Sequence, residues 1–114
     1  DMEETKNMAS SEPERVKRVN DIGERVRSEL RRLGFNIGKS VTPIVPIIIG
    51  DDSNTFATWK ALFENGVFVN PVISPAVPQG SQLLRTSYMA THTDEQIDRV
   101  LETYEKIGKK FGII

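Results

Sequence analysis

Three places in this sequence hold side chains suited to chemistry, and two of them favour a structural role. Asp51 and Asp52 are adjacent carboxylates in front of an amphipathic segment, where acids usually cap a helix and interact with its dipole. His92 is the single histidine, and only Asp94 lies close enough in sequence to orient it. We therefore expect a hydrogen-bonded structural histidine rather than a general base.

The third candidate is Arg85, which follows the proline-rich segment 70–80 and precedes two short polar side chains, Thr86 and Ser87. In such a setting a guanidinium can present a fixed, planar pair of donors to a carboxylate or a phosphate. Periodicity alone favours the plainer interpretation, an ordinary arginine on the surface of a small domain.

Composition excludes several classes of function. The 114 residues suffice for one domain, and 38% hydrophobic with 27% charged residues is typical of a folded chain. The absence of cysteine rules out disulfides and thiolate sites, and one histidine cannot form a multi-histidine metal site, so we expect no metal. A net charge of −1 provides no strong attraction to nucleic acid. The longest apolar run, 43–49, is too short to cross a bilayer, and no signal peptide is recognisable, so we expect a cytoplasmic protein without a transmembrane segment.

Hydrophobic periodicity and turn residues predict six elements. They are a helix over about 11–33, a strand over 42–49, a helix capped by Ser53 and closed by Asn65-Gly66, a strand over 67–69, a strand over 83–89, and a final helix behind a Thr93–Gln96 capping box. This order, αβαββα, predicts an α+β fold with a three-stranded, mainly antiparallel sheet and helices on one face. Residues 1–10 show no sustained period and could be disordered, which leaves 11–114 as a single domain.

Two helical faces and one strand carry further expectations. Charges of both signs alternate along the helix 11–33, so we expect them to pair locally on a solvated face. The second helix should carry Phe56, Trp59, Leu62 and Phe63 on one face. The segment 43–49 is apolar on both alternations, although Pro46 favours an edge strand. We infer that its second face docks on a larger domain or another subunit; the alternative is a helix that crosses to that face.

A run of short motifs resembles the C-terminal domain of the α-oxoamine synthases, pyridoxal-phosphate enzymes of fold type I. The matching pieces are Thr42-Pro43-Ile44-Val45-Pro46, Gly66-Val67, Pro75-Ala76-Val77-Pro78-Gln79-Gly80, Leu84-Arg85 and Ala90-Thr91-His92-Thr93, in the family's order. The entry segment Glu12-Pro13-Glu14-Arg15-Val16 also fits. Val67-Phe68-Val69-Asn70-Pro71 together with Ser74-Pro75-Ala76-Val77-Pro78 is most similar to the bacterial serine palmitoyltransferase branch. Branches that make 8-amino-7-oxononanoate or 2-amino-3-oxobutyrate share most of this frame.

The resemblance implies a function for the intact protein and a role for two parts of this chain. The enzyme would use pyridoxal phosphate to condense an amino acid, serine by preference, with an acyl-CoA, palmitoyl-CoA by preference, and would release carbon dioxide. Arg85 would hold the amino-acid carboxylate, and the loop of Ser74, Pro75, Ala76, Val77 and Pro78 would close over the active-site mouth. Ser74 stands where many relatives have a proline, so the loop would lose part of its rigidity. Ile73 stands where one branch has an arginine, so a second arginine that binds the carboxylate would be missing here.

Most of the catalytic machinery would lie outside this chain. The resemblance implies that the cofactor lysine belongs to a large domain of the same polypeptide, and that the enzyme is a homodimer. Lysines such as Lys60, Lys106, Lys109 and Lys110 occupy helical faces expected to be exposed and match no catalytic motif. We therefore expect this chain alone to be inactive. The competing hypothesis is a stand-alone, non-enzymatic α+β interaction module.

Overall fold

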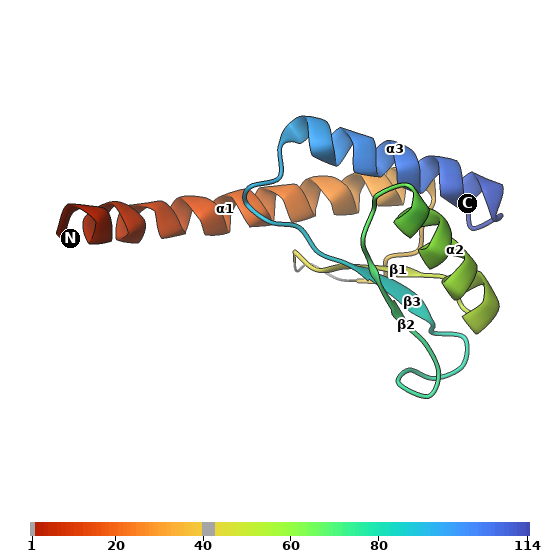
Figure 1. Ribbon diagram of the computed structural model, residues 1–114. Coiled ribbons are helices and arrows are strands. Elements are labelled where there is room, and N and C mark those ends of the chain that lie inside the picture. Colours follow the sequence, from red (N-terminus) through yellow and green to blue (C-terminus); the bar gives the residue numbers. More distant parts are fainter. Residues whose placement is uncertain (1, 40–42) are drawn as a thin grey trace.

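The computed structural model describes residues 2–39 and 43–114, which form three helices and one sheet (Figure 1). The elements are α1 (Met2–Leu33), β1 (Val45–Ile48), α2 (Asp52–Glu64), β2 (Asn70–Val72), β3 (Leu83–Thr86) and α3 (Asp94–Lys110). The predicted order αβαββα is therefore confirmed.

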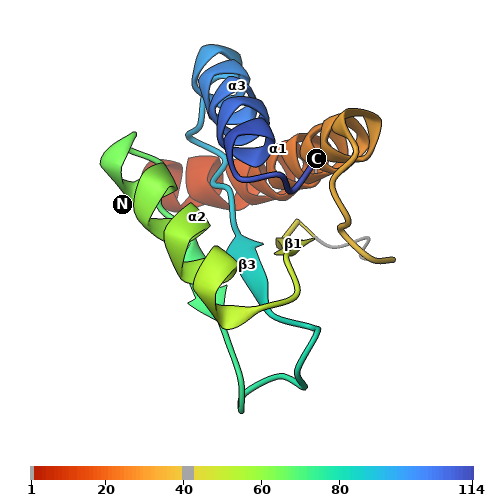
Figure 2. The ribbon, with the colours of Figure 1, turned by 90° about the vertical axis from the view of Figure 1, so that its right-hand side faces the viewer.

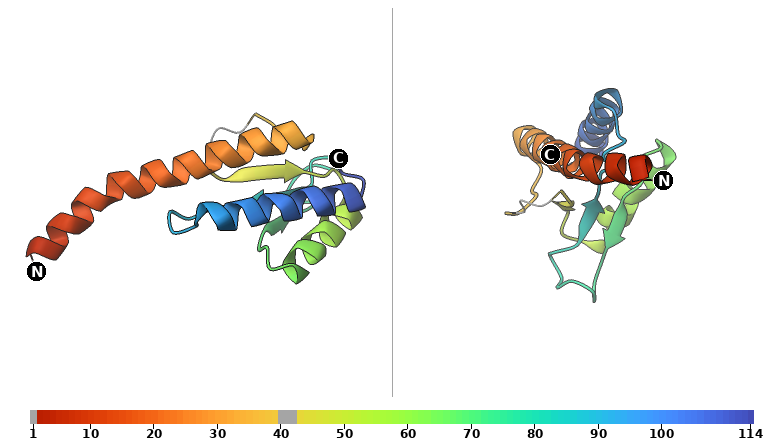
Figure 3. Two further views of the ribbon diagram at one scale, coloured as in Figure 1. Left: turned by 90° about the horizontal axis from the view of Figure 1, so that it is seen from above. Right: turned by 90° about the vertical axis from the view of Figure 1, so that its left-hand side faces the viewer.

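The first helix begins at Met2, so the predicted start at the Ser11 capping box is wrong. Pro13 lies inside the helix instead of in its first turn. The residues before it are mostly good helix formers without glycine, and they allow the helix to continue past the proline. The helix is visibly curved and its N-terminal half leaves the body of the molecule (Figure 3), which gives the chain a longest dimension of 52 Å.

The sheet has the order β1-β3-β2, and both pairings are antiparallel. β1 is an edge strand, as Pro46 predicted, because the missing N–H of proline is tolerated there. The predicted second strand at 67–69 is wrong, since the ladder forms three residues later, where Asn70 pairs with Arg85 and Val72 with Leu83. β3 ends at Thr86 rather than at Met89, because Thr86 is the last residue with a partner on β1, Val45.

Helix caps differ in one place from the expectation. The N-cap of α2 is Asp51 rather than Ser53, and its carboxylate accepts a hydrogen bond from the backbone N–H of Asn54 at 2.7 Å. The Thr93–Gln96 capping box at the start of α3 is confirmed. The structural interpretation of Asp51 is thus confirmed as well.

All three helices bury side chains in a core on one face of the sheet (Figure 2), which excludes the alternative of a helix that crosses to the other face. α1 and α2 contact the strands, and α3 lies across both helices. The sheet contributes Val45, Ile47, Leu84 and Thr86, each almost fully buried. The helices contribute Ile22, Val26 and Leu30 of α1, Leu62 of α2, and Ile97, Leu101, Tyr104 and Ile107 of α3.

Of the four apolar residues expected to share a face of α2, only Leu62 is fully buried. The inward residues of the helix are Thr55, Thr58 and Leu62, whereas Phe56 and Phe63 are about half exposed. Small threonines allow α2 to approach β2 and β3 closely, and Thr55 satisfies its hydroxyl by donating to the carbonyl of Asp51. The aromatic side chains pack instead on each other at the surface, with Phe63 5.8 Å from Trp59 and 5.4 Å from Phe68 between ring centroids.

Charged side chains of α1 pair both locally and across to α3. Lys17 binds Asp21 and Arg32 binds Glu29, as expected from helical spacing. Arg18, by contrast, binds Asp94 at 2.9 Å, and Arg25 binds Asp98 and also lies 3.8 Å from Asp94, so these three pairs join α1 to α3. The expected local pairing therefore describes only some of the ion pairs, because α3 places further carboxylates next to α1.

A buried hydroxyl chain joins β3 to α3 and the edge strand. Thr86 donates to the carbonyl of Val45 at 2.7 Å, Tyr88 donates to Thr86 at 3.0 Å, and the hydroxyls of Tyr88 and Tyr104 lie 3.1 Å apart. Burial raises the pKa of Tyr88 and raises that of Tyr104 well above 10.0.

The two neighbouring leucines of β3 offer a test of this packing. Leu84→Ala removes a fully buried side chain from the central strand and should lower the free energy of unfolding by about 2–5 kcal/mol. Leu83→Ala, on the opposite face and only half-buried, is the matched control and should cost about 1 kcal/mol. Urea denaturation measures both; equal losses would contradict the assignment of the core face.

The tyrosine pair predicts a loss of stability at alkaline pH. Because the folded state holds both phenolic protons more tightly than the unfolded state, stability is complete below the unfolded pKa of 10.0 and falls as pH rises above it. The slope should reach about 1.4 kcal/mol per pH unit for each tyrosine. Tyr104→Phe should make this slope shallower, measured by urea denaturation from pH 8 to pH 11. An unchanged slope would show that Tyr104 does not titrate in this way.

Candidate functional site

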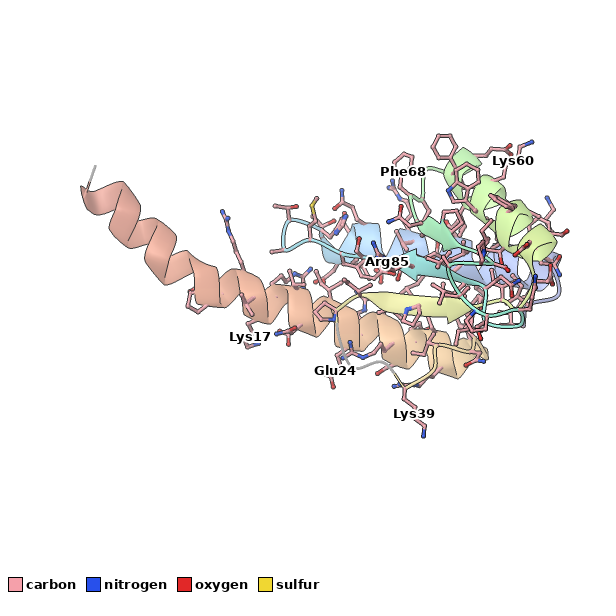
Figure 4. All side chains as sticks on the ribbon, turned by 90° about the horizontal axis from the view of Figure 1, so that it is seen from below. Lys17, Glu24, Lys39, Lys60, Phe68 and Arg85 are labelled. Atoms are coloured by element: carbon pink, nitrogen blue, oxygen red, sulfur yellow. The ribbon has the colours of Figure 1, made fainter. Side chains whose placement is uncertain are left out.

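Arg85 lies in the middle of the central strand, on the face of the sheet that the helices leave open (Figure 4). The strand alternates strictly here: Leu84 and Thr86 point into the core, so the residue between them must point the other way. Arg85 is exposed, and its neighbours across the sheet are Pro46 on β1 and Asn70 on β2. The role of Arg85 in binding a carboxylate stays a prediction at this point.

The guanidinium of Arg85 has no ion pair or hydrogen bond with any described residue. This distinguishes it from Arg18, Arg25 and Arg32, whose charges are already paired with carboxylates. Arg85 is a planar cation with five donors, held on a rigid strand and surrounded by uncharged neighbours. Such an arrangement can bind a carboxylate through two parallel hydrogen bonds.

The predicted active-site loop belongs to the same hairpin as Arg85. Residues 73–82 join β2 to β3, so Ser74, Pro75, Ala76, Val77 and Pro78 leave one strand and the chain returns two residues before Arg85. The loop projects away from α3 in two perpendicular views (Figures 1 and 2). It is internally braced by hydrogen bonds from the N–H of Val77 to the carbonyl of Ile73 and from the N–H of Ser81 to that of Pro78.

Gln82 is a residue of this region that sequence reasoning missed. Its side chain is fully buried although it lies between an exposed loop and a strand. The Nε2 atom donates to the Oδ1 atom of Asp52 at 2.9 Å and to the Oε1 atom of Gln79 at 2.7 Å, while its Oε1 accepts from the N–H of Gly80 at 2.9 Å. The alternation that places Leu84 and Thr86 inside also places Gln82 inside, and this signal was available in the sequence.

The structural role expected for His92 is confirmed. Its Nδ1 atom accepts a hydrogen bond from the N–H of Met89 at 2.8 Å, and its carbonyl accepts one from Arg18 at 2.9 Å. Asp94, the one carboxylate that could have oriented the ring, binds Arg18 instead. His92 therefore closes a turn and anchors α1 next to the start of α3.

The described residues do not form a site for pyridoxal phosphate by themselves. A lysine that forms a Schiff base needs a desolvated or otherwise activated amine. The lysines whose side chains the structure describes are all exposed, and Lys17, Lys39 and Lys60 point outward from the body (Figure 4). Among the residues whose side chains the structure describes, 13–39 and 43–114, no cluster of acidic or histidine side chains could hold a metal ion. No helix in the described part of the chain has the length and apolarity to span a membrane.

The family model described as aminotransferase class I and II matches residues 2–103. Curated relatives include the 8-amino-7-oxononanoate synthase of Alkaliphilus oremlandii, 42% identical over 95% of this chain and 27% of the relative. The enzyme of the same name from Treponema denticola is 52% identical over 75% of this chain and 22% of the relative. The chain thus spans about a quarter of the length of these relatives.

Solved structures with the same fold include two serine palmitoyltransferases. The protein from Sphingomonas wittichii superimposes with a TM-score of 0.81 at 32% identity, over 86% of this chain and 25% of that protein. The one from S. paucimobilis, which holds pyridoxal phosphate with myriocin, gives 0.79 at 31% identity over 86% of this chain and 25% of that protein. These matches and the helix-backed antiparallel sheet confirm the predicted C-terminal small domain of fold type I enzymes. The chain belongs to the class I and II aminotransferase family, in its α-oxoamine synthase branch.

Proposed function

We propose that the protein containing this chain is a pyridoxal-phosphate-dependent acyltransferase that joins an amino acid to an acyl thioester. In the net reaction a carbon–carbon bond forms between the amino acid's α-carbon and the acyl carbonyl. The carbon–sulfur bond of the thioester breaks, and the carboxylate leaves as carbon dioxide. The cofactor would supply an electron sink for the α-carbon, and residues outside this chain would hold it.

The observation that carries the proposal is Arg85, whose guanidinium has no partner among the described residues, in a chain that matches the family over most of its length. Arg85 would bind the substrate carboxylate through both arms of its guanidinium and so fix the orientation of the bonds at the α-carbon. The loop 73–80, at the end of the same hairpin, would restrict access of water and of the thioester to that site. A homodimer, as the family resemblance implies, is the assembly we propose.

For the substrates, the relatives favour the 8-amino-7-oxononanoate reaction over the serine palmitoyltransferase reaction that the motifs suggested. The product's name defines the reactants: a methyl group beside the amino-bearing carbon requires alanine, and the seventh-carbon ketone requires a seven-carbon dicarboxylic acyl group. The structural similarity to serine palmitoyltransferases supports the second candidate, serine with palmitoyl-CoA.

A substrate matrix tests both candidates. The full-length protein, loaded with pyridoxal phosphate, is incubated with alanine, serine or glycine and with pimeloyl-CoA or palmitoyl-CoA, and the released CoA thiol is measured. We expect the highest kcat/KM for alanine with pimeloyl-CoA. Preference for serine with palmitoyl-CoA would support the second candidate. An absence of turnover with every pair would contradict both and favour the stand-alone interaction module.

Arg85 variants test the carboxylate site separately. Arg85→Lys keeps the charge but loses the planar pair of donors, and Arg85→Ala loses both, so amino-acid affinity should fall in the order Arg, Lys, Ala. A charge-assisted bidentate pair is worth about 2–4 kcal/mol, so the Ala variant should bind about thirty-fold to several hundred-fold more weakly. The measurement is a titration of the cofactor's visible absorbance with amino acid in the full-length protein.

An exposed arginine at the end of α1 provides the control for this series. Arg31→Ala removes the same charge from a position outside the proposed site and should leave the dissociation constant unchanged. Thermal unfolding should show that none of these variants loses much stability, because the exposed guanidinium of Arg85 makes no hydrogen bond to the described residues. An unchanged dissociation constant in Arg85→Ala would return Arg85 to the status of a surface residue.

A further inference from the structure

A fully buried, uncharged amide sits at the base of the exposed loop 73–80. Gln82 uses both ends of its side-chain amide, since the oxygen accepts one hydrogen bond and the nitrogen donates two. A buried amide with satisfied groups on both ends is fixed in one orientation, because every alternative leaves a polar atom unpaired. The side chain of Gln82 is therefore a rigid connection rather than a mobile polar group.

Gln82 connects the loop to residues 49–52, about thirty residues earlier in the sequence. Its side chain joins the loop, at Gln79 and Gly80, to the first turn of α2, at Asp52. Its backbone carbonyl accepts hydrogen bonds from the N–H groups of Ile49, at 2.8 Å, and Gly50, at 3.0 Å, just after β1. The bond to Asp52 is the strongest of these connections in kind, because its acceptor is a carboxylate.

The loop has few other connections to the body of the molecule. In the part of the chain that the structure describes, the side-chain hydrogen bonds of residues 73–82 all involve Gln82. The backbone bonds from Val77 and Ser81 remain inside the loop. Loss of the amide would thus release the loop from α2 while the pairing of β3 with β1 and β2, which holds Arg85, stays intact.

We propose that Gln82 is a positioning residue: its amide holds the loop 73–80 against the first turn of α2 and so sets where the loop stands relative to Arg85. The connection itself follows from the contacts above; its effect on catalysis rests on the proposed function. Without this connection the loop would occupy its position against α2 for a smaller fraction of the time. The apparent affinity for the acyl thioester would fall by that fraction. The amino acid, held by Arg85 on the sheet, would bind as before.

The first variants break the hydrogen bond between residues 82 and 52, and the double variant restores it with donor and acceptor exchanged. Gln82→Leu removes both hydrogen-bonding ends while keeping a buried side chain of similar length. Gln82→Glu alone places a carboxylate against Asp52, which repels it. Combined with Asp52→Asn, the same substitution again pairs a donor with an acceptor, because the Asn amide can now donate. Gln96→Leu is the matched control, since it removes a glutamine that bonds at the start of α3, far from the loop in sequence.

The first measurement is hydrogen exchange in the full-length protein. Exchange of the amides of Ser74, Ala76, Val77, Gln79 and Gly80 should be about ten-fold faster in Gln82→Leu and in Gln82→Glu. It should return toward wild type in the Gln82→Glu/Asp52→Asn double variant. Gln96→Leu should leave the loop unchanged. Unchanged loop exchange in Gln82→Leu, or a double variant as fast as Gln82→Glu alone, would overturn the proposal.

The second measurement separates the role in catalysis from the proposed function. With an active pair of substrates, Gln82→Leu should lower kcat/KM for the acyl thioester about ten-fold while the amino-acid dissociation constant stays the same, and the double variant should recover. Faster loop exchange without any kinetic change would overturn the positioning role. If the full-length protein turns over none of the substrates, the proposed function fails, and the exchange data alone decide whether Gln82 holds the loop.

Discussion

The pairing of β3 with a strand on each side is the constraint on which the rest of this structure depends. A central strand has no freedom to rotate, so its period of two decides the environment of each residue along it. Leu84 and Thr86 belong to the core, and Arg85 must emerge on the opposite face. A shift of one residue in the register would bury the guanidinium and expose the leucine, which makes the position of the charge as secure as the fold itself.

The sequence predicted the parts of the fold that local pattern controls. Three features follow from spacing or from the chemistry of one residue such as Pro46: the order of the elements, the α3 capping box and the edge position of β1. The predictions failed where the bounds of a strand or the burial of a side chain depend on residues that are distant in sequence. The strand forms at Asn70–Val72, although residues 67–69 have the higher β-propensity. Asn70–Val72 are the residues that lie opposite Leu83 to Arg85 in the folded sheet.

A similar limit applied to α2 and to Gln82. An apolar pattern on a helix usually indicates the face that packs on the core. In α2 the small threonines Thr55 and Thr58 are buried instead, and Phe63 packs on Trp59 and Phe68 at the surface. Gln82 was passed over because a glutamine beside a loop is usually solvated. The alternation along β3 indicates that Gln82 points inward, but its hydrogen-bond partner Asp52 lies thirty residues earlier, and no local pattern indicates that partner.

The projection of α1 has a mechanical consequence. The helix first meets α3 near Arg18, and the turns between Met2 and that residue project from the body over about 24 Å (Figure 3). Over such a distance a tilt of about 10° at the body displaces the far end by about 4 Å, which makes the arm an amplifier of small rotations. Pro13 has no N–H, so one backbone hydrogen bond of the helix is missing there. The helix therefore bends most easily near Pro13 and is stiffer away from it.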